Sequence, residues 1–353
     1  MNNAAPSTVR KTSPKLNGRG VRDSTNCSAI RLLGLGVYLP ERVMTNDEWS
    51  QYVDTTDEWI TTRTGIKQRH VAAPEESTAT LAVAAARDAL DRLGMCPEDI
   101  DEIIVVTDTP EVCIPDTAPF VQHQLGARQV PSYTLSGSGC AGFLQALEIA
   151  SSRVDSGVGR ILVVGAEILT RLVSWQDRNT CVLFGDAAAA AVIGHGTVGA
   201  EILAIVAGTD GSQTGLLTIE VGGTRHPFTL EAARQGKHQQ VTMNGKQLFR
   251  HAIARMAEAA VQVLAKAQAT LQDVALVIPH QANLRIVEGV ANALHLPLQK
   301  FFIDVQDYGN TGSASVPLAV WDAQKQGKIA PGSLVLTTSF GAGLHWAAAL
   351  LRF

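Results

Sequence analysis

Hydrophobic positions along this chain form two kinds of pattern. Short runs such as EIIVVT at 102–107 are apolar without alternation, which predicts strands that are covered on both faces. Longer stretches such as 78–93 place Leu and Ala at helical spacing. The patterns predict strands at 30–36, 102–107, 133–135, 161–164, 181–184, 274–278, 301–305 and 334–337, and helices at 78–93, 141–153, 248–269 and 284–294. Strands that alternate with helices indicate an α/β protein with mainly parallel sheets.

The pattern is repeated once along the chain. Two apolar segments recur 172 residues later: DEIIVV at 101–106 returns as DVALVI at 273–278, and ILVV at 161–164 returns as SLVL at 333–336. The same spacing takes Cys140 to Gly312, and each of these residues lies in a loop between a predicted strand and a helix. We therefore predict a duplicated α/β unit, with one half at 28–200 and the other at 201–353.

Composition excludes several classes of protein. The chain has 353 residues, 46% hydrophobic and 18% charged, so general disorder is excluded. A net charge of −4 argues against a nucleic-acid partner. The longest apolar run, 187–193, is far shorter than the roughly 20 residues of a membrane span. The first 27 residues carry five basic side chains against one acidic one, so we predict a disordered basic tail at 1–27, with an organellar transit peptide as the alternative.

Five scattered cysteines, without a CxxC pair, suggest neither a metal site nor a disulfide framework. This usage fits a reducing compartment, and we expect the cytoplasm. Cys140 differs from the others because it follows the glycine-rich turn SGSG and precedes a predicted helix. Unpaired N–H groups and the dipole at a helix N-terminus favour a thiolate, so we expect a nucleophile here.

Two further polar residues lie where predicted strands end. His280 follows a buried strand in the segment PHQANLR, and Asn310 lies in the loop YGNTGSAS. The duplication is expected to bring Asn310 close to Cys140. Cys, His and Asn together suggest acyl chemistry with a thiolate. A papain-like protease uses the same three residue types in the same order, but its local cysteine signature is absent and a duplicated parallel α/β architecture is not its fold.

On these residues the sequence resembles the β-ketoacyl-acyl-carrier-protein synthase III family, the initiating condensing enzymes of type II fatty acid synthesis. The resemblance covers residues 29–353 and is carried by VDTTDEWITTRTGI (53–66), GCAGF (139–143), LFGDAAAA (183–190), PHQANLRI (279–286), YGNTGSASVPLA (308–319) and SFGAGLHWAAALLRF (339–353). It implies the thiolase fold, in which duplicated βαβαβαββ halves form α-β-α-β-α layers. It also implies a homodimer that uses an acyl-CoA and a malonyl acyl carrier protein, with no metal and no cofactor beyond the coenzyme A thioester.

The resemblance also implies roles for individual residues. Cys140 would be acylated, His280 and Asn310 would support decarboxylation, and the backbone amides of Cys140 and Ala342 would form the oxyanion hole. Three groups of contacts would serve the substrates: Trp59, Arg63 and Arg178 for coenzyme A; Gln281, Ala282, Asn283, Leu284 and Arg285 for the carrier protein; and Ile114 for the acyl pocket.

Some positions depart from the family pattern. SGSG precedes Cys140 where small apolar residues are usual, Ala342 interrupts a glycine run, and Ile114 stands where an aromatic residue is common. We expect condensation of a short acyl-CoA, such as acetyl-CoA, with malonyl carrier protein. The alternative is a specialised homologue that primes or transfers acyl groups in secondary metabolism or cofactor synthesis. A degradative thiolase, a 3-hydroxy-3-methylglutaryl-CoA synthase and a subunit without a nucleophile fit the motifs less well.

Overall fold

The computed structural model describes residues 29–353, so the tail predicted at 1–27 lies outside the described residues. Nine of its strands form one sheet in the order β11-β12-β13-β8-β1-β7-β6-β4-β5. The strands are β1 (Ile30–Tyr38), β4 (Glu102–Val106), β5 (Ser132–Leu135), β6 (Arg160–Glu167), β7 (Ala187–His195), β8 (Ala200–Thr209), β11 (Val274–Pro279), β12 (Leu334–Gly341) and β13 (His345–Arg352). Two small sheets pair β2 (Val43–Thr45) with β3 (Gln68–His70) and β9 (Leu217–Ile219) with β10 (Val241–Met243).

The sheet confirms the duplication. β4 pairs in parallel with β6, with Val106 opposite Gly165, and β11 pairs in parallel with β12, with Ile278 opposite Thr337. Both residues of the second pair lie 172 positions beyond those of the first. β7 and β13 then follow as antiparallel neighbours of β6 and β12. The two groups of strands meet where β1 and β8 pair over two residues.

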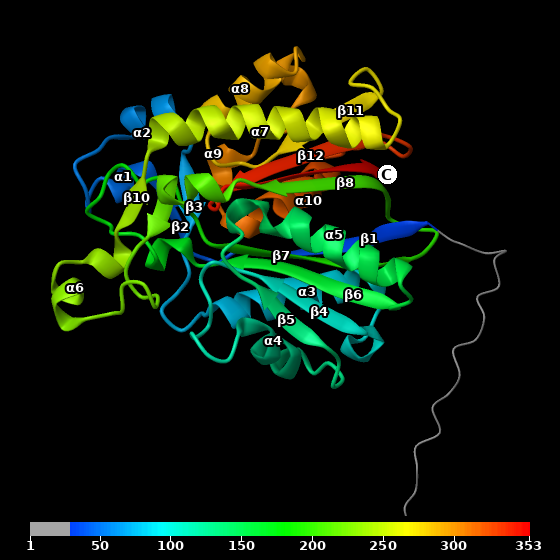
Figure 1. Ribbon diagram of the computed structural model, residues 1–353, viewed down its shortest axis with the longest axis horizontal. Helices are drawn as coiled ribbons and strands as arrows, with labels where there is room; N and C mark the ends of the chain where they lie inside the picture. The colour runs from blue at the N-terminus through cyan, green and yellow to red at the C-terminus, as the bar shows by residue number, and fades with distance from the viewer. Residues whose placement is uncertain (1–28) are drawn as a thin grey trace, which may run out of the picture.

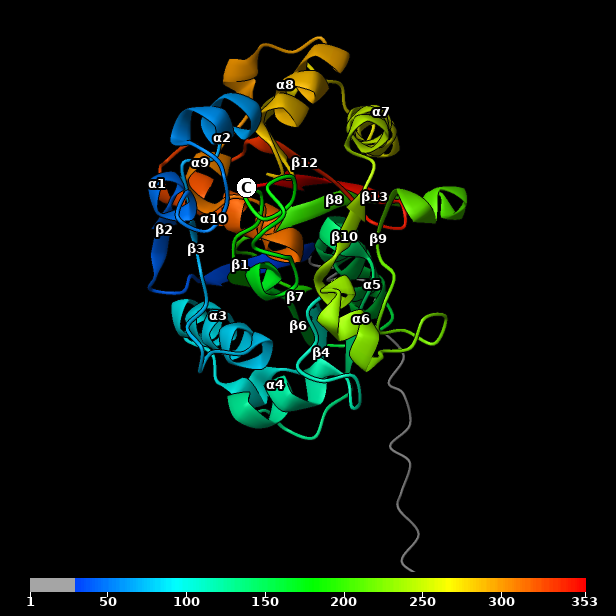
Figure 2. The same ribbon diagram turned by 90° about the vertical axis from the view of Figure 1, so that its left-hand side faces the viewer.

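Helices divide the molecule into layers, as Figures 1 and 2 show. α3 (Thr78–Leu93) and α4 (Thr117–Leu125) cover one outer face, and α7 (Gly245–Lys266) and α8 (Leu284–Ala293) cover the other. Between the two groups of strands lie α5 (Gly142–Asp155) and α10 (Ser315–Lys325). The short helices are α1 (Asn46–Trp49), α2 (Asp57–Thr64), α6 (Leu230–Arg234) and α9 (Val305–Tyr308). This is the α-β-α-β-α arrangement that the family resemblance implies.

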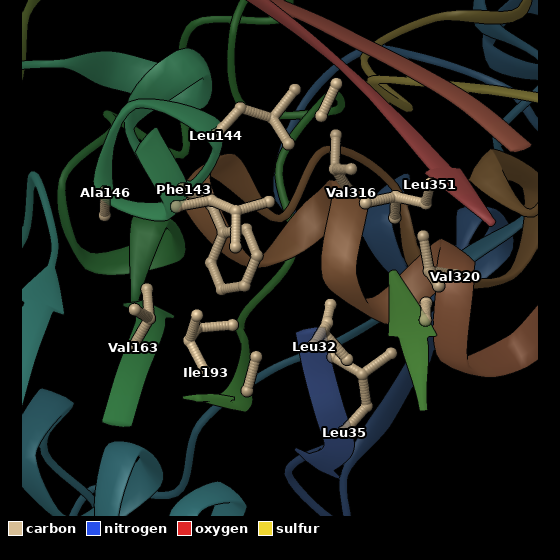
Figure 3. Packing of buried hydrophobic residues seen from close by; sticks show 14 of the residues in the cluster. Leu32, Leu35, Phe143, Leu144, Ala146, Val163, Ile193, Val316, Val320 and Leu351 are labelled. Atoms are coloured by element: carbon tan, nitrogen blue, oxygen red, sulfur yellow. The ribbon is translucent and has the colours of Figure 1, made fainter. Parts of the chain in front are cut away.

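The middle layer is held from both sides. Phe143 of α5, Val316 and Val320 of α10, and Leu32 and Leu35 of β1 belong to one buried cluster (Figure 3). Burial of each such side chain contributes roughly 1.5–3 kcal/mol relative to exposure. Because α5 and α10 are clamped in this way, the loops that lead into their N-termini have little freedom to move.

The helices predicted from periodicity agree closely with the structure. α3 has the predicted bounds, because Ser77 and Thr80 form a capping box at its start and Gly94 ends it with φ 61°. No helix within residues 29–353 is long and apolar enough to cross a membrane.

Two predicted strands are wrong. Residues 181–184 form turns, with only Phe184 bridging to Asn310. Of residues 301–305, only Phe301 makes a strand bridge, because the Gln281 side chain then bonds the backbone of the following residues and α9 begins at Val305. An apolar run is compatible with a buried loop as well as with a strand, so periodicity does not separate the two.

Candidate active site

Cys140 lies in a one-turn 3₁₀ helix, Gly139–Ala141, between β5 and α5. The chain reaches it through Gly137 and Gly139, whose φ values of 74° and 53° are left-handed and suit glycine. The carbonyl oxygen of Cys140 accepts a hydrogen bond of 2.6 Å from the hydroxyl of Ser339 on β12. The nucleophile's turn in the first half of the chain is therefore fixed by a strand of the second half.

Asn310 meets Cys140 from the other half. Its Oδ1 lies 3.7 Å from the Cys140 Sγ and accepts the N–H of Gly312 at 2.9 Å. The backbone of Asn310 bonds to Leu183 and Gly185, part of the LFGDAAAA segment. With Oδ1 engaged in this way, the side-chain Nδ2 is the donor that Asn310 offers to a substrate oxygen.

His280 follows β11 directly and is 4% exposed. Its backbone N–H donates to the Thr338 carbonyl at 2.8 Å, and the next residue on β12 is the Ser339 that bonds Cys140. The ring Nδ1 is buried without a hydrogen-bond partner, and burial lowers the pKa of His280 to about 3. At neutral pH the ring is therefore uncharged. Its single N–H can donate a hydrogen bond, but the ring does not carry the extra proton of an imidazolium ion.

The charge environment of Cys140 corrects one expectation from the sequence. Burial raises the pKa of the Cys140 thiol, and the nearby carboxyls of Asp108 and Glu167 raise it further, whereas Asn310 acts against them. We expected the helix N-terminus to favour the thiolate. Burial and two acidic neighbours outweigh that effect, so the resting nucleophile is a thiol.

The end of β12 packs directly on the nucleophile's backbone. A Cβ added to Gly341 would lie 2.5 Å from the amide nitrogen of Cys140, and one added to Gly139 would lie 2.6 Å from that of Ala342. Glycine at both positions thus lets the two segments approach backbone to backbone. The amides of Cys140 and Ala342, predicted to form an oxyanion hole, lie in this contact.

The three residues predicted to bind coenzyme A lie together. The guanidinium carbons of Arg63 and Arg178 are 4.5 and 4.6 Å from the ring centroid of Trp59. Arg178 also donates to the carbonyl of Asp54 at 2.8 Å. A base sandwiched between Trp59 and Arg178 needs two van der Waals gaps, roughly 7 Å in total, so Arg178 must move to admit it.

The segment predicted to bind the carrier protein divides into two parts. Gln281 is 1% exposed, and its amide bonds the backbone at Pro279, Phe302 and Asp304, so its predicted surface contact is wrong. Gln281 instead connects backbone segments inside the protein through its side-chain hydrogen bonds.

The rest of the segment lies nearer the surface. Ala282 and Leu284 are partly buried, and Leu284 packs beside Gly65. The Asn283 side chain caps α8 and donates to the Arg63 carbonyl, while Arg285 donates to the Thr62 carbonyl at 3.2 Å. The exposed part of the segment is therefore joined to α2.

Ile114 is 89% exposed. It belongs to the exposed loop between β4 and α4. This exposed position does not support the predicted contact with an acyl pocket of the same chain.

Comparisons with known proteins identify the family of this chain. Residues 136–211 match the family described as 3-oxoacyl-[acyl-carrier-protein (ACP)] synthase III, and residues 264–353 match the description of its C terminal part. A β-ketoacyl-[acyl-carrier-protein] synthase III from Nitratidesulfovibrio vulgaris is 46% identical over 327 residues, 91% of this chain and 98% of the relative. A namesake from Roseiflexus sp. (strain RS-1) is 44% identical over 323 residues, with shares of 91% and 98%.

The chain belongs to the β-ketoacyl-acyl-carrier-protein synthase III family.

Solved structures place this synthase III family member in the thiolase fold. The Aquifex aeolicus VF5 3-oxoacyl-[acyl-carrier-protein] synthase III is 43% identical, with a TM-score of 0.83 over 92% of this chain and 100% of the other. The priming β-ketosynthase of the R1128 polyketide biosynthetic pathway is 37% identical, with a TM-score of 0.84 over 95% and 99%. The chain is accordingly an acyltransferase of the condensing class.

Sequence reasoning missed three polar residues of this synthase III site: Asp108, Glu167 and Ser339. The signal that finds them is the repeat spacing. A shift of 172 residues takes Asp108 to His280 and Glu167 to Ser339. Once one half's strand ends are known to face the site, the matching positions of the other half become candidates as well.

Proposed function

We propose that this enzyme transfers a short acyl group, with acetyl as the leading candidate, from coenzyme A to Cys140 and then condenses it with malonyl acyl carrier protein. The observation that carries the proposal is the meeting of Cys140 and Asn310, 3.7 Å apart, from the two halves of the fold. The family membership of the chain supports the same reaction. The halves at 28–200 and 201–353 would then supply the nucleophile and the decarboxylation pair, respectively.

The first step is transfer of the acyl group. The Cys140 sulfur attacks the thioester carbonyl, the carbon–sulfur bond to coenzyme A breaks, and the departing thiolate gains the proton that Cys140 loses. The amides of Cys140 and Ala342 would receive the oxyanion. Trp59, Arg63 and Arg178 would hold coenzyme A at the surface, with Arg178 displaced from the ring that it covers in this structure.

The second step forms a carbon–carbon bond. The malonyl thioester loses CO2, and His280 and Asn310 would donate hydrogen bonds to the enolate oxygen. The enolate carbon attacks the acyl group on Cys140, and the carbon–sulfur bond to Cys140 breaks. The neutral state of His280 suits this role, because a buried uncharged donor stabilises a developing negative charge without a proton transfer.

The partners follow from the exposed features. We propose a cytoplasmic homodimer that forms at the β5 edge of the sheet, where the neighbouring loop exposes Val112 and Ile114. Ile114 would then enter the acyl pocket of the second copy. The surface from Ala282 to Arg285, continuous with α2, would receive the carrier protein.

A specialised priming synthase is the second candidate. It is favoured by the 37% identity with the priming β-ketosynthase of the R1128 pathway and by the polar turn before Cys140. One experiment tests both candidates: the protein is mixed with acyl-CoAs of increasing length and branching, and the adduct on the Cys140 peptide is quantified by mass spectrometry. Preference for acetyl-CoA supports initiation of fatty acid synthesis, preference for a longer or branched acyl-CoA supports the specialised role, and absence of any adduct overturns both.

A further inference from the structure

Asp108 occupies the place in the first half that His280 occupies in the second. It lies two residues beyond β4, and a shift of 172 residues takes it to His280, just beyond β11. The register of the two parallel strand pairs has the same shift, so the equivalence holds in space as well as in sequence. In parallel sheets, functional groups gather at these carboxyl ends.

The Asp108 carboxylate holds the turn that carries the nucleophile. Its Oδ1 accepts the N–H of Gly137 at 3.0 Å, and the N–H of Gly139 also bonds to it. Neither the 3₁₀ turn Gly139–Ala141 nor α5 has a side-chain N-cap of its own. Asp108 therefore adds side-chain hydrogen bonds to the two left-handed glycines of this turn.

A second carboxyl lies against the first. The backbone N–H of Asp108 donates to both oxygens of Glu167, at 3.2 and 3.1 Å, and Glu167 also bonds the hydroxyl of Ser313. Burial and then the charge of Asp108 raise the pKa of Glu167 to about 8. Burial raises the pKa of Asp108 as well, but the N–H groups of Gly137 and Gly139 oppose that rise. With its pKa at about 8, Glu167 holds a proton at neutral pH, and the two carboxyls titrate as a pair.

We propose that Asp108 is a positioning residue for the nucleophile: it fixes the turn before Cys140 and, together with Glu167, makes the reactivity of the thiol depend on the charge of this carboxyl pair. The effect of Asp108 on acylation rests on the proposed function, whereas its effect on the reactivity of the Cys140 thiol does not. Within residues 29–353, Asp108 also faces His345 at the start of β13, which bonds the hydroxyl of Thr209. Burial lowers the pKa of His345, so it brings no compensating charge at neutral pH.

The wild-type protein provides the first test. The rate at which iodoacetamide alkylates Cys140 is measured by peptide mass spectrometry from pH 6 to 9.5, with exposed Cys96 as the internal reference. The rate rises with the thiolate fraction. When Glu167 loses its proton, the added negative charge opposes thiolate formation, so the profile should flatten near pH 8. A profile that rises through this range as a single ionisation, like that of Cys96, would overturn the proposal.

Variants separate the charge from the hydrogen bonds. Asp108→Asn keeps an oxygen for the glycine N–H groups but removes the charge, so alkylation at pH 8.5 should be faster. The gain should be largest, on the order of tenfold, in Asp108→Asn/Glu167→Gln, because in the single variant Glu167 ionises and restores part of the charge. Glu167→Gln should by itself remove the break near pH 8. The matched control is Asp91→Asn, an exposed carboxylate on α3.

Asp108→Ala removes both the charge and the acceptor. Its acylation by acyl-CoA should fall at least tenfold, and Asp108→Asn should recover most of that loss. Equal alkylation profiles in the wild type, Asp108→Asn and the double variant would overturn the proposal even if every variant is acylated normally. Normal alkylation effects without acylation in any form of the protein would instead contradict the proposed function.

Discussion

The two loops that meet at the site have similar backbone conformations but carry different functional groups. Each makes a single 3₁₀ turn, at Gly139–Ala141 and at Gly312–Ala314, and enters a helix of the middle layer; the first turn follows β5 and the second follows α9. The first loop carries a thiol with two carboxyls around it, whereas the second carries the Asn310 amide, and the same half supplies the neutral imidazole of His280 at the end of β11. The duplicated fold supplies the geometry twice, and we propose that different residues at matched positions give each half a separate step of one reaction.

The matched residues Ser339 and Glu167 differ in the group to which they hydrogen-bond. Ser339 of the second half bonds the Cys140 carbonyl, and its counterpart Glu167 of the first half bonds the Ser313 hydroxyl. Each half therefore fixes the loop of the other. A change on one strand is expected to act on the chemistry of the opposite half, and Gly341→Ala on β12 tests this below.

The largest effect is expected for Cys140→Ser. A serine hydroxyl is far less acidic than a thiol, and the side-chain partner of Cys140 within residues 29–353 is the amide of Asn310 rather than a strong base, so acyl transfer should fall by at least about 10³-fold. The melting temperature should stay close to that of the wild type. The measurement is release of coenzyme A from acyl-CoA, and transfer at the wild-type rate would remove Cys140 from its role.

His280→Ala and Asn310→Ala should damage the other half of the reaction. Each removes one donor for the enolate, so decarboxylation of the malonyl thioester should fall by about 10²–10³-fold. Acylation of Cys140 should persist. Labelled CO2 release measures the first step and adduct formation the second. Unchanged decarboxylation in both variants would show that the second half does not have this task.

Gly341→Ala tests the contact between the halves. The new methyl would lie 2.5 Å from the Cys140 amide, and backbone there cannot yield cheaply. We expect a loss of about 1–3 kcal/mol in the free energy of unfolding, together with slower acylation. Gly245→Ala, where a Cβ meets no atom within 4 Å, is the control for denaturant unfolding. Equal behaviour of the two variants would mean that the close approach is unimportant.

The smallest effect is expected for Arg285→Glu, which concerns the carrier protein. Reversal of this exposed charge should raise the apparent KM for malonyl carrier protein about tenfold, roughly 1.4 kcal/mol. Acylation by acyl-CoA should be nearly unchanged. Arg234→Glu, an exposed arginine on α6, is the control in the same assay. Equal loss in both half-reactions would place Arg285 outside the docking surface.

The sequence was most informative where a pattern is repeated. The spacing of 172 residues anticipated the duplicated sheet and the approach of Asn310 to Cys140, because register is preserved through each strand-helix unit. It was least informative for β7, whose five alanines have low strand propensity and are ordered by packing under α3 and α10. The raised pKa of the Cys140 thiol could not be predicted from the sequence either, because Asp108 and Glu167 are distant along the chain and come close to Cys140 only in the folded structure.

The division of the reaction between the halves is tested most directly by the fate of the acyl group on Cys140. Wild-type protein and His280→Ala are loaded with acyl-CoA, mixed with malonyl carrier protein and quenched over time, and the Cys140 peptide is quantified by mass spectrometry. Both proteins should carry the adduct at first. The wild type should then lose it as the β-ketoacyl product forms, whereas His280→Ala should retain it for at least about 10² times longer. Equal rates of loss, or an adduct on another cysteine, would contradict the account.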